Sequence, residues 1–212
     1  MKNSYMYIGL ILLFCSLTTY GQGRDSIQQT IDKGKSDLLE VLMKSDNGFN
    51  FGLDISEVKA SRGNIAVPYK EMDFKKLLKY RDQQGMESVL NATPKAVAPL
   101  VMENKVVTTI SVSENEKGGF SVAELINLQY QTELNQLPEE VKQNGFKDLS
   151  IVFVPNLFCT IYNARGVSFT SYNGRSLREG IDPEVLMQEL KADAVKFQEK
   201  YGEIVKKGKI VN

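Results

Sequence analysis

The sequence predicts an α+β protein, in which a mostly antiparallel, curved sheet of two meanders is covered by N-terminal, central and C-terminal helices. Residues 95–124 and 149–172 each hold three short apolar runs separated by polar turn residues, which is the pattern of a three-stranded meander. Residues 25–44 and 182–201 repeat apolar side chains every three or four positions, as amphipathic helices do. The other segments are short and are expected to cover or connect these elements.

Residues 1–21 are predicted to be a signal peptide rather than part of the fold. Lys2 supplies a minimal positive region, and residues 6–17 form an apolar core of 12 residues. A secretory signal has these features, whereas a membrane span needs about 20 apolar residues. Cleavage between Gly21 and Gln22 would leave a single α+β domain, residues 22–212, in the periplasm or outside the cell.

Two alternatives to a cleaved signal stay open. Cys15 follows an apolar run and could be lipidated as in a bacterial lipoprotein, although the large side chain of Phe14 argues against that processing. The uncharged stretch 3–23 could also remain as an uncleaved anchor. Only in these two cases would the chain meet a membrane.

The N-terminal half is expected to contain one long helix and several short elements. Asp25 or Ser26 can cap a helix that runs to Lys44, and Gly34 weakens its middle by about 1 kcal/mol relative to alanine. The shorter elements predicted after this helix are an extended piece at 49–53, a helical turn capped by Asp54, a strand at 65–69, a helix at 74–81 capped by Asp73 and a short strand at 86–90. Pro68 confines the strand at 65–69 to a sheet edge or to a strand end.

The first meander is the clearest strand pattern in the chain. Ala98, Leu100 and Met102 alternate, a turn is centred on Asn104, and residues 106–113 then alternate with period two. Six of those eight residues are β-branched, as is usual in strands. This middle strand is expected to be half-buried, with one face packed and the other open.

The C-terminal half is expected to alternate a helix, the second meander and a final helix. Residues 125–137 have helical periodicity, and a further helical turn begins at Pro138. The run 149–155 is nearly all apolar, so it is predicted to be the middle strand of the sheet. Asp182 and Pro183 mark the beginning of the last helix.

Composition and missing residue types exclude several functions. The chain has 26 basic and 26 acidic residues, so it lacks the basic excess of a nucleic-acid-binding protein. It contains no histidine, which removes histidine-based triads and dyads and histidine-ligated metal or haem sites. No glycine-rich phosphate loop or calcium loop is present. We therefore expect no catalytic residues, no metal and no cofactor, and Cys159 is expected to be a buried small apolar residue.

The candidate ligand-binding residues lie in and before the loop after the second meander. Arg175 and Arg178 make this loop basic, so it could hold a small anion, while Tyr162 and Tyr172, with Phe169, could line a groove. Alternating aromatic residues on strands can equally be core residues or cross-strand pairs. If a site exists, we expect it at this loop or on the concave side of the sheet.

The order of a helix, a small edge strand and the stretch 97–125 resembles secreted bacterial domains of cystatin-like or nuclear-transport-factor-like build. The resemblance covers residues 49–172 and implies a curved sheet around a helix. The protease-binding QxVxG loop of cystatins is absent, so inhibitor function is not implied.

The leading functional hypothesis is an exported, non-catalytic binding or envelope-associated protein, whose partner would be another envelope or secreted protein. The alternatives are a hydrolase that uses paired carboxylates on cell-envelope glycans, and a protease-inhibitor-like module.

Overall fold

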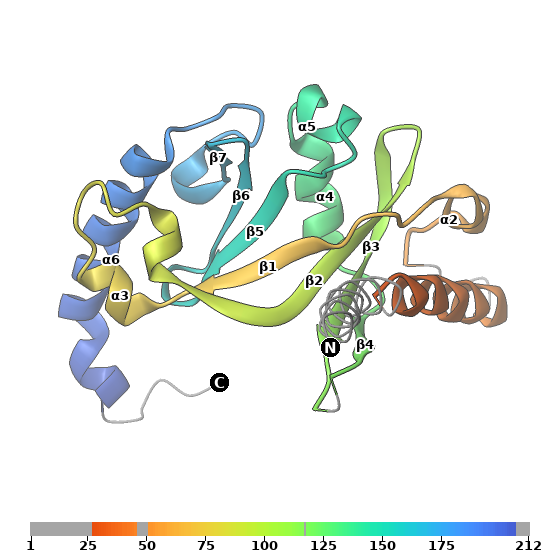
Figure 1. The fold of residues 1–212 in the computed structure, drawn as a ribbon, viewed down its shortest axis with the longest axis horizontal. Coiled ribbons are helices and arrows are strands. Elements are labelled where there is room, and N and C mark those ends of the chain that lie inside the picture. The colour runs from red at the N-terminus through yellow and green to blue at the C-terminus, as the bar shows by residue number, and fades with distance from the viewer. Residues whose placement is uncertain (1–26, 46–50, 117, 207–212) are drawn as a thin grey trace, which may run out of the picture. The chain divides into compact units, whose positions relative to one another are not determined.

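The computed structural model describes residues 27–45, 51–116 and 118–206, with side chains described as far as residue 202. The predicted signal peptide, with its cleavage point and Cys15, lies outside these residues, as do Phe49 and Asn50 of the predicted extended piece at 49–53 and the tail after 206. The prediction of an extended piece is wrong for the described part, because Phe51 and Gly52 form a turn in which both have positive φ. The chain divides into two compact units (Figure 1). Unit 1 holds residues up to Ala66 and Val97–Leu128, and unit 2 holds Val67–Ala96 and the residues from Gln129 onward.

The structure confirms the α+β class, with seven strands that form one open, mostly antiparallel sheet. The strands are β1 (Val67–Met72), β2 (Leu90–Met102), β3 (Lys105–Glu114), β4 (Phe120–Glu124), β5 (Leu149–Val154), β6 (Cys159–Ala164) and β7 (Val167–Phe169). Their order in the sheet is β4-β3-β2-β1-β5-β6-β7. Both predicted meanders are therefore present, and β2 passes from unit 2 into unit 1.

The strand that contains Pro68 does not lie at a sheet edge, because β1 is the fourth of seven strands, so Pro68 takes the other predicted place, at a strand end. β1 pairs with β5 in parallel, and the first registered pair is Tyr69 with Ile151. Pro68 precedes this pair at the beginning of the strand, where a missing N–H is tolerated. The apolar strand β5 is interior, as expected, but the middle position belongs to β1.

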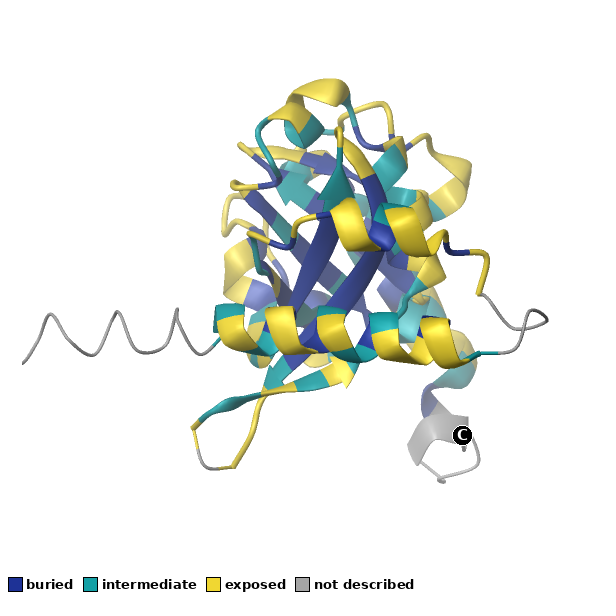
Figure 2. Ribbon diagram, turned by 90° about the vertical axis from the view of Figure 1, so that its right-hand side faces the viewer, coloured by how far each residue is buried: buried dark blue, intermediate teal, exposed yellow. Residues whose placement is uncertain are grey.

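In unit 1 the N-terminal helix, residues 27–44, packs against strands β3 and β4 (Figure 2). Ile31, Leu38 and Leu42 form its buried stripe. A Cβ atom at Gly34 would lie 3.0 Å from a Val122 methyl and 3.1 Å from an Ile110 methyl. The glycine that weakens this helix therefore lets it approach the sheet closely.

Strand β3 differs from the prediction of a half-buried strand. All residues from Val106 to Val112 are buried, so both faces of the strand are covered. A period-two pattern cannot reveal the second buried face, because Thr108, Thr109 and Ser111 lie among the apolar residues and look like solvent-facing positions.

Helix α2 (Ile55–Ala60) completes unit 1. The Asp54 side chain accepts hydrogen bonds from the Ser56 and Glu57 backbone N–H groups, which confirms the predicted cap. Glu57 also pairs with Lys105 at the beginning of β3, with 2.8 Å between nitrogen and oxygen.

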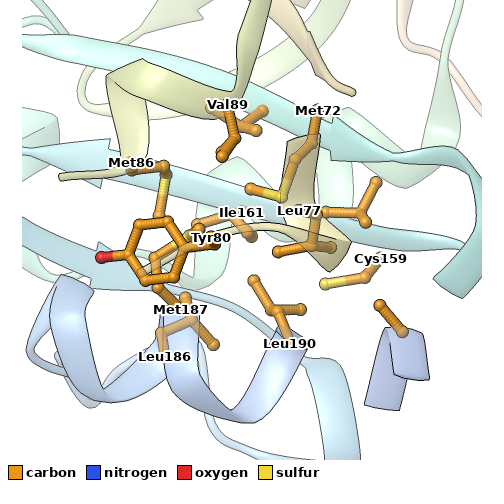
Figure 3. Packing of buried hydrophobic residues seen from close by; sticks show 13 residues of the cluster. Met72, Leu77, Tyr80, Met86, Val89, Cys159, Ile161, Leu186, Met187 and Leu190 are labelled. Atoms are coloured by element: carbon orange, nitrogen blue, oxygen red, sulfur yellow. The ribbon is translucent and has the colours of Figure 1, made fainter. Parts of the chain in front are cut away.

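In unit 2 one face of the sheet is covered by α3 (Phe74–Leu78), the 3₁₀ helix η1 (Met86–Val89) and the long helix α6 (Pro183–Lys206) (Figure 3). Val152, Val154 and Ile161 from the sheet pack there against Leu186 and Leu190 of α6. The caps predicted at Asp73 and Asp182 are both present. The short strand predicted at 86–90 is instead η1, in which Met86 and Val89 lie three residues apart and both point into the core.

The alternate residues of β5 and β6 face the other side of the sheet in unit 2. Tyr69, Ile151, Tyr162 and Phe169 form one cross-strand row over β1, β5, β6 and β7. Tyr162 in this row bonds to Glu133 of α4 (Leu128–Gln136), and the short helix α5 (Glu139–Gln143) follows α4. The helix predicted at 125–137 is thus present as α4, which begins three residues later, and the further turn predicted from Pro138 is present as α5.

Candidate functional site

The four predicted ligand-binding residues do not form one site. Tyr162 is fully buried, so it cannot line a groove as predicted. Its hydroxyl donates a 2.6 Å hydrogen bond to the Glu133 carboxylate on α4. Burial, and then the nearby carboxylate, raise the pKa of Tyr162 far above its ordinary value, so the hydroxyl stays protonated and acts as a donor inside the fold.

Tyr172 and Arg175 attach the loop to helix α6. The Tyr172 hydroxyl lies 3.0 Å from an Asp193 carboxylate oxygen, and the Arg175 guanidinium lies 2.5 Å from a Glu189 carboxylate oxygen. The charge of Arg175 is therefore neutralised within the fold. These contacts position the loop, and they leave Arg178 as the basic residue that can meet a ligand.

Arg178 is exposed on a loop that is fixed on both sides. Leu177 beside it is 3% exposed, and the Arg178 N–H bonds to the Ser176 hydroxyl. Further on, the Ile181 and Ser168 backbones exchange two hydrogen bonds, of 2.8 and 3.0 Å, across to β7. A Cβ atom at Gly180 would lie 2.4 Å from a Val167 methyl, so only glycine allows this close approach. The backbone that carries Arg178 is thus held in place.

The Arg178 side chain borders a recess of about 380 Å³ at the turn between α4 and α5. The recess is also lined by Asn135, Gln136, Leu137, Pro138, Glu139 and Lys142. The Lys142 side chain is only 12% exposed, and its ammonium lies 2.5 Å from Glu139 and 3.3 Å from the Asn135 carbonyl. Lys142 is therefore already neutralised. Within the described part of the chain Arg178 has no ion pair, so it gives the recess an excess positive charge.

A second, smaller recess lies on the other side of α5. Its volume is about 150 Å³, and its walls are mostly apolar, with Val141 and Phe146 on one side and Leu149, Ala164, Val167 and Phe169 from the strands. Glu140, Asn144, Asp148 and Arg165 form the rim. The α5 helix thus separates a polar recess from an apolar one.

The titration behaviour of the described groups gives no support to acid–base catalysis. The carboxyls with a clearly shifted pKa are Asp54, Asp73, Asp148 and Asp193, and all four are lowered by hydrogen bonds. A glycosidase general acid needs a raised value. At the apolar recess the Arg165 hydrogen bond keeps the pKa of Asp148 low, so this acid stays ionised.

The described residues also contain no cluster of three or more acidic or cysteine side chains that could hold a metal ion. Cys159 is buried as predicted, and burial raises the pKa of its thiol to about 11, so it is not a reactive nucleophile near neutral pH. Among the helices in the described ranges, none is both long and apolar enough to cross a lipid bilayer.

Comparisons with protein-family models, with curated proteins and with solved structures found no significant match. The resemblance to cystatin-like and nuclear-transport-factor-like domains therefore stays a prediction.

Only some of the residues that line the polar recess could be predicted from the sequence. Arg178 could be found because it lies in a basic loop after a strand. Its neighbours Asn135 and Lys142 could not, because they lie about 40 residues away and look like ordinary residues of an exposed helix.

Proposed function

We propose that this chain is an exported, non-catalytic binding protein that holds an anionic group, such as a carboxylate, in the polar recess beside Arg178. The observation that carries the proposal is an arginine with no ion pair among the described residues, mounted on a fixed loop over a recess of about 380 Å³. Recesses of about 300 to 1,000 Å³ are the usual size of ligand sites.

An anion is the ligand class that fits these residues best. The guanidinium is planar, remains charged at any working pH and can bind a carboxylate through two parallel hydrogen bonds. The ion pair of Lys142 with Glu139 supplies no free charge, so the ligand would balance the charge of Arg178. Because the loop is already ordered, little conformational entropy is lost on binding.

The cellular setting of this proposal comes from the sequence. A protein exported behind residues 1–21 would meet its ligand in the periplasm or outside the cell. An acidic group on another envelope or secreted protein fits both the predicted location and the chemistry of the recess. The paired-carboxylate hydrolase is favoured less, because the resolved carboxyl pKa shifts are all downward.

The proposal is tested by titration calorimetry with an N-acetyl-aspartate-containing peptide, inorganic phosphate and a neutral asparagine-containing peptide. We expect the acidic peptide to bind and the asparagine peptide not to bind. Arg178→Ala should weaken binding about 10- to 100-fold, because a hydrogen bond to a charged group contributes about 1.5–3 kcal/mol. Arg178→Lys should restore part of the affinity, since it returns the charge without the planar geometry.

Arg81→Ala is the matched control, because it removes the same charge from an exposed position of unit 2 outside the recess. Equal affinity of the Arg178→Ala variant and the unchanged chain for the acidic peptide would contradict the proposal. Binding of phosphate alone would keep the anion site but exclude an acidic protein group as its ligand.

A further inference from the structure

Two basic side chains border the polar recess, and a carboxylate of the same recess neutralises one of them. The Lys142 ammonium lies 2.5 Å from a Glu139 carboxylate oxygen, whereas Arg178 has no ion pair among the described residues. Glu139 itself lines the recess. The recess therefore holds two cations and one acid of its own chain, and the Glu139 carboxylate occupies a place on Lys142 that the carboxylate of a ligand could take.

Lys142 is held at the recess by more than its ion pair. Its side chain is only 12% exposed, and its ammonium also donates a hydrogen bond of 3.3 Å to the Asn135 carbonyl. Asn135 lies in the last turn of α4, where backbone carbonyls have no acceptor role left inside the helix. The ammonium therefore keeps a partner and its position when Glu139 moves away.

Glu139, in contrast, can leave at little cost. Its side chain is 64% exposed, and it lies in the first turn of α5, three residues before Lys142. An ion pair with an exposed partner at this spacing changes an equilibrium constant by a factor of about 5 at most. A charge-assisted hydrogen bond from Lys142 to a ligand carboxylate contributes a factor of about 10 to 100. A ligand thus gains more from Lys142 than the protein loses with Glu139.

We propose that Glu139 is an internal competitor in the polar recess, and that the ligand is a dicarboxylate that displaces Glu139 and contacts Lys142 and Arg178 together. This inference rests on the proposed anion site, to which it adds a second cation and a second negative group on the ligand. Once Glu139 turns to solvent, the two cations balance the two charges of the ligand. A small dicarboxylate fits a recess of about 380 Å³.

The test is titration calorimetry with N-acetylaspartate, which carries two carboxylates, and with its α-amide, which carries one. We expect the unchanged chain to bind the diacid about 10-fold more tightly than the α-amide, because only the diacid reaches both cations. Glu139→Gln should raise the affinity for the diacid at least about 3-fold, since no carboxylate then competes for Lys142.

Glu140→Gln is the matched control. It removes the same charge from the next residue in the first turn of α5, but Glu140 lines the apolar recess on the other side of the helix. Its affinity for the diacid should stay within about 1.5-fold of that of the unchanged chain, because a charge outside the recess is screened by solvent and salt.

Lys142→Met tests the second cation, because it keeps most of the aliphatic side chain and removes the charge. It should lower the affinity for the diacid about 10-fold, to nearly that for the α-amide. In the Lys142→Met background, Glu139→Gln should no longer raise the affinity, because the competition depends on the lysine. Should Lys142→Met fail to fold, the comparison of Glu139→Gln with Glu140→Gln still decides.

The results separate this inference from the proposed function. Equal affinities of the Glu139→Gln and Glu140→Gln chains for the diacid overturn the inference, as do equal affinities of the unchanged chain for the diacid and the α-amide. In either case, binding of the α-amide that is lost in Arg178→Ala leaves the proposed anion site standing. If neither compound binds to the unchanged chain or to the Glu139→Gln chain, both proposals are overturned.

Discussion

At the scale of single residues, the hydrogen bond between Tyr162 and Glu133 shows how a polar pair can serve the core. The tyrosine ring is fully buried, and its hydroxyl donates to the carboxylate at 2.6 Å. The pair joins strand β6 to helix α4 within unit 2. We expect this pair to stabilise the fold, because the hydroxyl is enclosed and does not border either recess.

Replacing Tyr162 with phenylalanine should lower the free energy of unfolding by about 1.5–3 kcal/mol, because the half-buried Glu133 carboxylate loses its donor at 2.6 Å on the buried side and keeps the exposed Gln129 amide at 3.2 Å. Urea unfolding followed by circular dichroism measures the change. Tyr172→Phe is the control and should cost less than about 1 kcal/mol, since Asp193 keeps Lys196 and Asn173 as donors. Equal losses in the two variants would show that the Tyr162 bond is no stronger than an exposed one.

The residues of the candidate site were only partly predictable, for a physical reason. Sequence patterns show that Tyr162 and Val167 lie on strands, but they do not show which strand face is covered by a helix. That depends on the docking of α4, which is a contact between distant residues. Gly63 is a similar case. A Cβ atom there would lie 2.7 Å from Leu100 and 2.8 Å from Ile31, although the sequence shows only a loop.

At the scale of elements, the reliable predictions were those that depend only on residues close together in the sequence. The caps Asp54, Asp73 and Asp182 all accept backbone hydrogen bonds at the predicted helix starts. Capping is decided within four residues, so it can be read directly from the sequence. The order of strands is decided by long-range pairing, and this is why the central place of β1 was missed.

Asp182→Ala should destabilise the protein by about 1 kcal/mol, because helix α6 loses the acceptor for the Glu184 and Val185 N–H groups. Thermal unfolding of the variant beside Asp182→Asn, which keeps a capping side chain, measures the difference. The asparagine variant should retain most of the stability. If both variants lose as much, the carboxylate charge at the helix start matters more than the hydrogen bonds.

At the scale of the whole molecule, the charge balance and the buried hydroxyls decide how stability depends on pH. The chain has nine tyrosines and no histidine. Stability therefore has no histidine contribution near neutral pH, and the resolved shifts act at the two extremes. The four lowered carboxyls act in acid, where stability is lost as the pH falls through their folded-state pKa values.

The loss of stability at alkaline pH should be set by four tyrosines whose pKa values are all raised, foremost by burial. They are Tyr69, Tyr80, Tyr162 and Tyr172. The value for Tyr80 is about 12, and the Cys159 thiol, at about 11, shifts in the same direction. Each group releases its proton at lower pH in the unfolded chain than in the folded one. The stability that the tyrosines contribute is therefore complete below about pH 10, that of Cys159 is complete below about pH 9, and both are lost as the pH rises further.

Absorbance at 295 nm during an alkaline titration checks this expectation, because it counts tyrosinate directly. We expect the four tyrosines with raised pKa values to ionise only together with the loss of the circular dichroism signal. Tyr162→Phe should make the fall of the urea midpoint with pH less steep, because its most strongly shifted hydroxyl is gone. Lysine deprotonation affects both proteins alike, so the difference between them isolates the tyrosine. A single ionisation step near pH 10 without unfolding would mean that these hydroxyls reach water, and the packing of α4 against β6 would then have to be reconsidered.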